Sequence, residues 1–294
     1  MSLTAEQVQE FREEGVLAAE GVLTDDDLAP VIAEYTAWID RRAQELQAGG
    51  RLTDLCESES FERRLACLFA QTPEIASGLD IMLVRGPASF AFLHNEPLLD
   101  AVEQLVGPEI TCNPIQHIRA KPPASSSAGA GAGFYNVPWH QDAGVTWEEA
   151  DDSNIVTCWL ALVDATVENG CMEVMPGVWK GGYREHQAEG GTTIRPDLLP
   201  DVTPRPVPVR KGGIVFMHRY TPHRSTPNLS GHVRWSLDLR YQPTGVPTGR
   251  PFHPDFIVRS RKDPASVRED YGEWCRRWEE ALETSKGAKW HRVK

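Results

Sequence analysis

The chain has 294 residues, of which 40% are hydrophobic and 24% are charged, and its formal net charge is −12. This composition is typical of a folded protein with a full hydrophobic core. The acidic balance argues against nucleic acid or an anionic membrane surface as the main partner. The N-terminus carries no signal-peptide pattern, and no apolar run approaches the about 20 residues of a membrane span. We therefore expect a cytoplasmic protein that is not attached to a membrane.

The six cysteines are scattered along the chain, and none of them forms a Cys-x-x-Cys pair. Such a pattern argues against a disulfide framework and against a zinc knuckle. The sequence therefore predicts reduced thiols, most of them in the core.

The first third of the chain, residues 1–109, is predicted to be helical. A short amphipathic helix covers residues 4–14 and ends at Gly15. Thr24, with Asp27 three residues later, forms a capping-box pattern that opens a longer helix. This helix ends at Gly49-Gly50, and its apolar residues recur three and four positions apart: Leu28, Val31, Ile32, Tyr35, Trp38, Ile39 and Leu46. Two further short helices are expected at 61–69 and 97–106.

From about residue 110 to 245, the pattern changes to short strands separated by Gly and Pro turns. The candidate strands are 115–120, 154–163, 171–175, 206–209, 213–218 and 233–241. Short strands without intervening helices predict an all-β core of the antiparallel barrel or double-sheet jelly-roll type. A C-terminal helix follows at about 264–285, with one apolar stripe. No linker separates these parts, so residues 1–294 are predicted to form a single domain with flanking helices.

The triplet His140-Gln141-Asp142 lies in the middle of the chain. On extended backbone, residues two apart point to the same side, so the imidazole and the carboxylate can bind the same metal ion. With one more histidine they would form a 2-His-1-carboxylate facial triad, which binds Fe(II) and leaves positions open for other ligands. The third ligand must come from the remaining eight histidines. His218 and His223 both lie late in the chain, and spacing alone does not choose between them.

Several further motifs occur in a fixed order around this triplet. They are Ala120-Lys121-Pro122-Pro123, then Trp139-His140-Gln141-Asp142, then the turn from Glu168-Asn169-Gly170 to Pro176-Gly177, then Lys211-Gly212-Gly213, then His223-x-Ser225-x-Pro227-Asn228, and Arg234 eleven residues after His223. Together they resemble the phytanoyl-CoA dioxygenase family of Fe(II)/2-oxoglutarate-dependent oxygenases. The resemblance implies a double-stranded β-helix core and Fe(II) ligation by His140, Asp142 and His223.

The same resemblance implies that 2-oxoglutarate is the co-substrate and O2 the oxidant. It assigns Arg234 and Ser225 to the distal carboxylate of 2-oxoglutarate. It also brings Gln116, Lys121 and Thr157 near the co-substrate. The last predicted strand agrees with this assignment, because Arg234, Ser236, Asp238 and Arg240 alternate with apolar residues and can form the inner face of a ligand-binding barrel. The fork of a guanidinium matches a carboxylate in a bidentate manner.

The implied reaction is hydroxylation of an unactivated C–H bond, with succinate and CO2 as co-products. Desaturation, cyclisation and epoxidation remain open, because similar enzymes carry out these reactions with the same cofactors. A halogenase of this fold would have a small residue in place of the carboxylate ligand, and Asp142 argues against it. A non-catalytic metal-binding jelly-roll protein is the other alternative, and Arg234 at the family spacing argues against it.

The sequence also departs from the family pattern. The Pro176-Gly177 turn is followed by Val178-Trp179, where the family commonly has Ser or Thr and then His. No clear basic cluster for a CoA tail is present. We therefore expect a rebuilt substrate side, and phytanoyl-CoA itself is not implied as the substrate.

A Ser/Ala/Gly-rich stretch, residues 125–133, ends seven residues before His140. Because long loops of flexible composition often act as lids, we predict a flap over residues 124–136 whose Phe134 and Tyr135 cover the substrate. Further candidates on the substrate side are Trp147, Trp179, Asp238 and Arg240. The expected partner is a small to medium-sized, partly apolar molecule.

Overall fold

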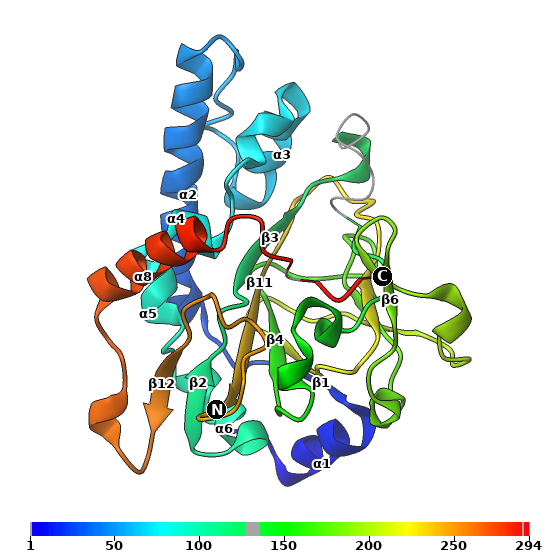
Figure 1. The fold of residues 1–294 in the computed structure, drawn as a ribbon. Helices are drawn as coiled ribbons and strands as arrows, with labels where there is room; N and C mark the ends of the chain where they lie inside the picture. Colours follow the sequence, from blue (N-terminus) through cyan, green and yellow to red (C-terminus); the bar gives the residue numbers. More distant parts are fainter. Residues whose placement is uncertain (1, 127–135, 290, 294) are drawn as a thin grey trace.

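The computed structural model describes residues 2–126, 136–289 and 291–293, and it combines a sheet-rich core with helices around it (Figure 1). The helices are α1 (Ala5–Glu14), α2 (Asp25–Ala48), α3 (Phe61–Gln71), α4 (Ile81–Val84), α5 (Pro87–Phe92), α6 (Glu96–Val106) and α8 (Tyr271–Thr284). The strands are β1 (Val16–Ala19), β2 (Glu109–Cys112), β3 (His117–Lys121), β4 (Val156–Ala161), β5 (Met172–Val174), β6 (His186–Ala188), β7 (Thr192–Ile194), β8 (Arg205–Val207), β9 (Ile214–His218), β10 (His223–Ser225), β11 (Arg234–Pro243) and β12 (Phe256–Ser260).

The N-terminal helices begin where their capping residues predict. At the start of α2, the backbone N–H of Thr24 donates to Asp27 Oδ2 at 2.8 Å, and the N–H of Asp27 donates to Thr24 Oγ1 at 3.3 Å. This reciprocal pair satisfies two donors that a helix start leaves without a partner. Helix α1 ends at Gly15, whose φ of 70° favours glycine. A Cβ at this position would come within 2.2 Å of the Trp179 ring.

Seven strands form the larger sheet, in which every pairing is antiparallel. The order is β1-β9-β4-β11-β2-β12, and β3 pairs with the first half of β11. Strand β11 is therefore central, because it pairs with β4 along one edge and with β3 and β2 along the other.

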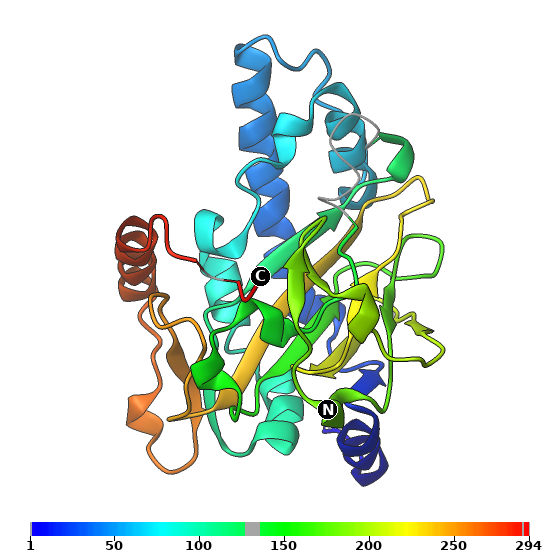
Figure 2. The ribbon, with the colours of Figure 1, turned by 45° about the vertical axis from the view of Figure 1, so that its right-hand side comes forward.

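A smaller antiparallel sheet, in the order β10-β5-β8, packs against the larger one. Apolar side chains of both sheets form one buried cluster between them: Val16, Trp159, Val215 and Met217 from the larger sheet, and Met172, Val174 and Val207 from the smaller one. Figure 2 brings the yellow-green strands of the smaller sheet forward, beside the diagonal strands of the larger sheet. Two packed antiparallel sheets form the predicted jelly-roll core.

The outer face of the larger sheet is covered by helices. Trp235, Leu237, Leu239 and Tyr241 of β11 are buried in one cluster with residues of α2, α6 and α8. The alternating residues of β11 point to the inside of the jelly roll, and Arg234 and Ser236 are buried there. The polar inner face that the sequence predicted for this strand is therefore confirmed.

The prediction that all six cysteines are reduced is wrong, because Cys56 and Cys67 form a disulfide. The segment before α3 folds back onto that helix, so the two Cα atoms lie 6.3 Å apart, which is within bonding range. The other four cysteines are free thiols: Cys112, Cys158, Cys171 and Cys275.

Strands β1, β2, β6, β7, β10 and β12 were not predicted. Each is only three to five residues long, which is too short for a clear alternation of polar and apolar residues. The last helix starts at Tyr271, later than the expected 264. Of the helices described, none is long and apolar enough to cross a membrane.

Candidate metal centre and its cavity

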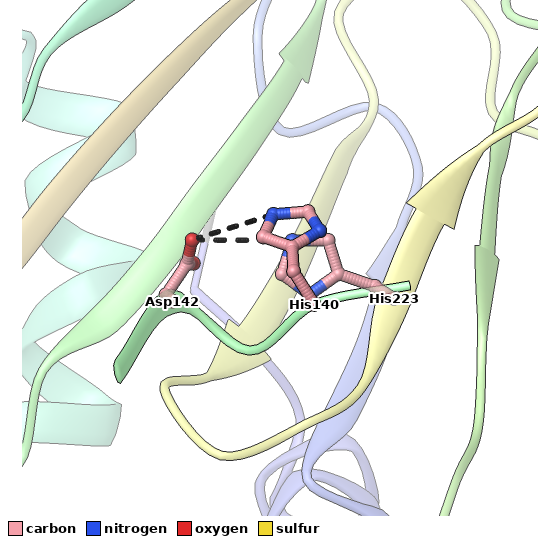
Figure 3. A group of neighbouring side chains, drawn as sticks. All are labelled: His140, Asp142 and His223. Atoms are coloured by element: carbon pink, nitrogen blue, oxygen red, sulfur yellow. Dashed lines mark ion pairs between the residues drawn. The ribbon is translucent and has the colours of Figure 1, made fainter. Parts of the chain in front are cut away.

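His140, Asp142 and His223 come together at the inner face of the jelly roll (Figure 3). The backbones of His140 and His223 form a two-way bridge, with N–H···O=C distances of 3.0 and 2.9 Å. Asp142 follows two residues later, at the first turn of a short 3-10 helix, Asp142–Val145. The ligand atoms of the three side chains all lie within 4.8 Å of one another. The Nε2 atoms of His140 and His223 are 4.0 and 3.9 Å from Asp142 Oδ1.

Both imidazoles are oriented for metal binding by a backbone carbonyl. His140 Nδ1 lies 2.9 Å from the carbonyl oxygen of Pro138, and His223 Nδ1 lies 2.9 Å from that of Thr221. A carbonyl can only accept, so each Nδ1 carries a proton, and Nε2 is the ring nitrogen that faces the metal position. Burial, and next the nearby His223, lower the pKa of His140 to about 3, so its ring is neutral at pH 7.

Asp142 is held as a carboxylate by two donors. Arg240 Nη2 donates to Oδ1 at 2.6 Å, and the hydroxyl of Thr157 donates to Oδ2. Burial alone would raise the pKa of Asp142, but Arg240 and the two histidines lower it well below its usual range. Two imidazoles and one carboxylate fit a divalent iron ion, because this donor set is that of the facial triad.

Gln141, between two of the ligands, faces away from the cluster and fixes its backbone. Its amide donates to the carbonyls of Gly182 and Tyr220 at 2.9 and 2.7 Å and accepts from the N–H of Arg184 at 2.7 Å. The N–H of Gln141 itself donates to Nε2 of the buried His186 at 3.0 Å. Sequence reasoning missed this support, although a polar residue on the outer side of a ligand strand is a signal for it.

The cluster opens into a cavity of about 650 Å³, a size that suits a small molecule. One end of the cavity is cationic. Lys121 Nζ donates to Ser225 Oγ at 2.7 Å and to the carbonyl of Thr226. Arg234, opposite Lys121 in the β3–β11 register, donates from Nη1 to Ser236 Oγ at 2.6 Å and lies over the Trp159 ring.

The basic groups at this end are buried with few partners. Burial, together with the charge of Arg234, lowers the pKa of Lys121 to about 7, and burial lowers that of Arg234 to about 10. In the described part of the chain, Arg234 Nε has no hydrogen-bond partner. An anion bound here would satisfy both side chains.

The model of the phytanoyl-CoA dioxygenase family, PhyH, matches residues 11–236. The chain belongs to the phytanoyl-CoA dioxygenase family. This is a family of 2-oxoglutarate-dependent non-haem iron oxygenases, and the cluster of two histidines and one aspartate agrees with it.

Among curated proteins, the chain is similar to the phytanoyl-CoA dioxygenase domain-containing protein 1 of Rattus norvegicus. The two are 24% identical over 301 residues, which cover 87% of this chain and 99% of that protein. Among solved structures, apo ThoJ, a non-haem monooxygenase, superposes with a TM-score of 0.66 at 18% identity, covering 96% of this chain and 100% of that one. EvdO2 from Micromonospora carbonacea var. aurantiaca, complexed with 2-oxoglutarate, gives a TM-score of 0.52 at 20% identity over 92% and 98% of the two chains. At these identities the structures establish the fold.

The remaining residues singled out in the sequence lie at different distances from the cavity of this phytanoyl-CoA dioxygenase family member. Asp238 and Arg240 line it, and Arg240 Nη2 lies 3.5 Å from Asp238 Oδ2 as well as bonding to Asp142. Gln116 and Thr157 are buried behind its wall, where Gln116 Nε2 donates to the Asn113 carbonyl at 3.0 Å.

Neither tryptophan expected on the substrate side belongs to the cavity wall as far as the structure describes it. The Trp147 indole donates to the carbonyl of Lys289, and that of Trp179 donates to the carbonyl of Glu13 and packs on His218. His218 is therefore engaged away from the cluster. Phe134 and Tyr135, with most of the proposed flap, lie outside the described residues.

Part of the wall comes from residues beyond the match to the phytanoyl-CoA dioxygenase family model. The side chains in this C-terminal segment that line the cavity are Asp238, Arg240, Arg250, His253, Leu282 and His291. The hydroxyl of Thr192 and Nδ1 of His291 are hydrogen-bonded, and the N–H of Arg292 donates to the carbonyl of Gly144 at 2.9 Å. The C-terminal segment thus forms part of the cavity wall, which sequence reasoning did not foresee.

Proposed function

We propose that the protein is an Fe(II)- and 2-oxoglutarate-dependent dioxygenase that hydroxylates an unactivated C–H bond of a small to medium-sized molecule. The observation that carries this proposal is one cavity that contains two kinds of group. At one place lies the cluster of His140, Asp142 and His223, and at the cationic end lie Lys121 and Arg234. The three metal-binding residues alone would also suit a non-catalytic binding protein, whereas the cationic end of the cavity can bind the distal carboxylate of the co-substrate.

His140, Asp142 and His223 would hold the iron through Nε2, an Asp142 oxygen and Nε2. Iron bound in this way would activate O2, which then oxidises the co-substrate and the C–H bond. The role of the protein's own residues is to keep these groups in the right protonation state. The carbonyls of Pro138 and Thr221 fix the histidine tautomers, and Arg240 with Thr157 keeps Asp142 ionised.

Lys121, Ser225 and Arg234 would bind the distal carboxylate of 2-oxoglutarate. Arg234 offers a fork of donors, Lys121 adds a charge, and the Ser225 hydroxyl already accepts from Lys121. Gln116 does not line the described cavity wall. We assign it only an indirect role at the co-substrate, because its amide donates to the Asn113 carbonyl and so supports the backbone before β3. Its Oε1 is buried, and it has no hydrogen-bond partner among the described residues.

The cavity also has an apolar wall, with Leu79, Met82, Met172 and Met217 among its residues. This wall supports a partly apolar substrate and excludes water from the reaction site. Desaturation, cyclisation or epoxidation would use the same groups, and the identity of the product separates them from hydroxylation. A cytoplasmic location remains a proposal.

The test is succinate formation from 2-oxoglutarate by the purified protein, with and without Fe(II). We expect Fe(II)-dependent succinate release in the wild type and its loss in His140→Ala, Asp142→Ala and His223→Ala, because each removes one of three protein ligands. The exposed His232 provides a matched control, and His232→Ala should keep the activity. A wild type without Fe(II)-dependent succinate formation would favour the non-catalytic binding protein. Activity in His223→Ala that is lost in His218→Ala would instead make His218 the ligand.

A further inference from the structure

The inner face of the β3–β11 strand pair carries a ladder of polar residues that runs along the cavity. Three cross-strand pairs lie in register: Lys121 with Arg234, Arg119 with Ser236, and His117 with Asp238. Residues 117, 119 and 121 share one face of β3 because side chains alternate along a strand. His117, Arg119, Lys121 and Asp238 all line the cavity. Arg119 thus lies between the co-substrate end and the His117–Asp238 pair.

The neighbours of Arg119 on this ladder have partners of their own. His117 Nδ1 lies 2.8 Å from Asp80 Oδ2, and Asp238 lies 3.5 Å from Arg240. Lys121 bonds to Ser225. Arg119 is exposed, and within the described ranges no hydrogen bond or ion pair involves its guanidinium. It is therefore a cation facing the cavity that no acidic side chain of the ladder neutralises.

Arg119 is close enough to influence both ends of the ladder. Burial, and after it the charge of Arg119, lower the pKa of His117. Burial lowers the pKa of Arg234, and Arg119 contributes in the same direction. Arg119 therefore adds positive charge beside both neighbours, and a bound anion would offset this repulsion.

The charge of the cavity wall contrasts with that of the whole chain. The described wall includes five basic side chains, Arg119, Lys121, Arg234, Arg240 and Arg250, and two acidic ones, Asp142 and Asp238. The chain as a whole has a formal net charge of −12. Arg240 is bonded to Asp142, and Lys121 with Arg234 is assigned to the co-substrate. The wall therefore keeps an excess of positive charge, which attracts an anionic molecule into it.

Apolar side chains lie on the same wall as Arg119. Ala76 and Leu79, which precede α4, and Met82, within α4, line the cavity. An apolar surface beside a single guanidinium suits a molecule with an apolar body and one oxyanion group.

We propose that Arg119 determines substrate specificity by binding a carboxylate or phosphate group of the substrate, whose apolar part packs against Leu79 and Met82. This inference rests on the proposed function, because it assigns Lys121 and Arg234 to 2-oxoglutarate. The substrate class is an amphipathic molecule with one oxyanion.

The test measures binding of matched eight-carbon probes by calorimetry, without oxygen, to protein saturated with Fe(II) and 2-oxoglutarate. The probes are octanoate, octyl phosphate and the neutral octanamide. We expect the better of the two anions to bind at least tenfold more tightly than octanamide, which corresponds to about 1.4 kcal/mol. Whichever anion binds more tightly identifies the carboxylate or the phosphate as the group recognised.

Three variants locate the effect. Arg119→Gln should abolish the preference for the anion, and Arg119→Lys should keep part of it because the charge remains. Arg205→Gln, at an exposed arginine on β8 outside the described cavity wall, should keep all of it. Equal binding of anions and octanamide to the wild type, including no binding of either, overturns the inference. So does a preference that survives in Arg119→Gln, or a loss in that variant of 2-oxoglutarate binding alone. Absence of Fe(II)-dependent succinate formation would instead refute the proposed function. That result comes from a different assay, so the two failures can be told apart.

Discussion

The buried ion pair between Arg240 and Asp142 should couple the stability of the protein to metal binding. Arg240 Nη2 lies 2.6 Å from Asp142 Oδ1, and their side chains are 4% and 2% exposed. Removal of one partner of a buried pair leaves the other charge uncompensated, at a cost of about 3–5 kcal/mol. In Arg240→Gln, the Thr157 hydroxyl is the one hydrogen bond that Asp142 keeps to a side chain of the described residues. We therefore expect the metal-free variant to lose stability by that amount, which for a chain of 294 residues lowers Tm by roughly 5–8 °C.

A divalent ion at the cluster supplies the counter-charge that Arg240 provided. Metal should therefore raise the Tm of Arg240→Gln more than that of the wild type, because only the variant has an uncompensated carboxylate. The assay is calorimetric unfolding of chelator-treated protein, with and without added Mn(II). Arg276, whose pair with Glu273 on α8 is 54% and 45% exposed, is the control. Arg276→Gln should cost at most about 1 kcal/mol. A loss that small in Arg240→Gln, or an equal metal-induced rise in Tm in both proteins, would refute the reasoning.

Three further results are expected. Arg234→Lys should raise the KM for 2-oxoglutarate roughly tenfold or more, because the bidentate fork is lost, whereas Arg205→Lys should leave it unchanged; equal KM values in steady-state succinate assays would count against this. Lys121 has a pKa of about 7, so it is charged below that pH, and the affinity for 2-oxoglutarate should fall from about pH 6 to about pH 8. Calorimetry on Lys121→Met should show an affinity that does not change with pH. An identical pH dependence in both proteins would exclude Lys121 as the cause. Opening the Cys56–Cys67 loop with Cys67→Ser should lower the free energy of unfolding by about 2–3 kcal/mol, measured in urea without reductant; no change would show that the bond constrains little.

Local patterns predicted much of the fold. The Thr24–Asp27 capping box predicted the start of α2, and the alternation along residues 233–241 predicted a strand with one apolar side and one polar side. These features depend on residues close in sequence, so periodicity reveals them. The strand from Phe256 to Ser260 gave no such signal, because it has only five residues and a register shift between Ile257 and Arg259 interrupts the alternation of buried and exposed side chains.

The candidate site could be predicted only in part, because its members meet through tertiary packing. His140 and Asp142 share a side by spacing, but His223 could be preferred over His218 only by family resemblance. The disulfide of Cys56 and Cys67 depends on how the chain folds back before α3. Arg119 carried a usable signal, since it lies two residues before Lys121 on the same strand face, and that signal was overlooked.

The position of the iron and of the co-substrate is best tested by a crystal structure of the protein with Fe(II) and 2-oxoglutarate, grown without oxygen. Anomalous scattering locates the metal independently of the protein density. The account predicts an ion bound by Nε2 of His140, Nε2 of His223 and an Asp142 oxygen, with the distal carboxylate of 2-oxoglutarate on Arg234 and Lys121. A metal held by His218, or a distal carboxylate bound away from Arg234, would contradict it.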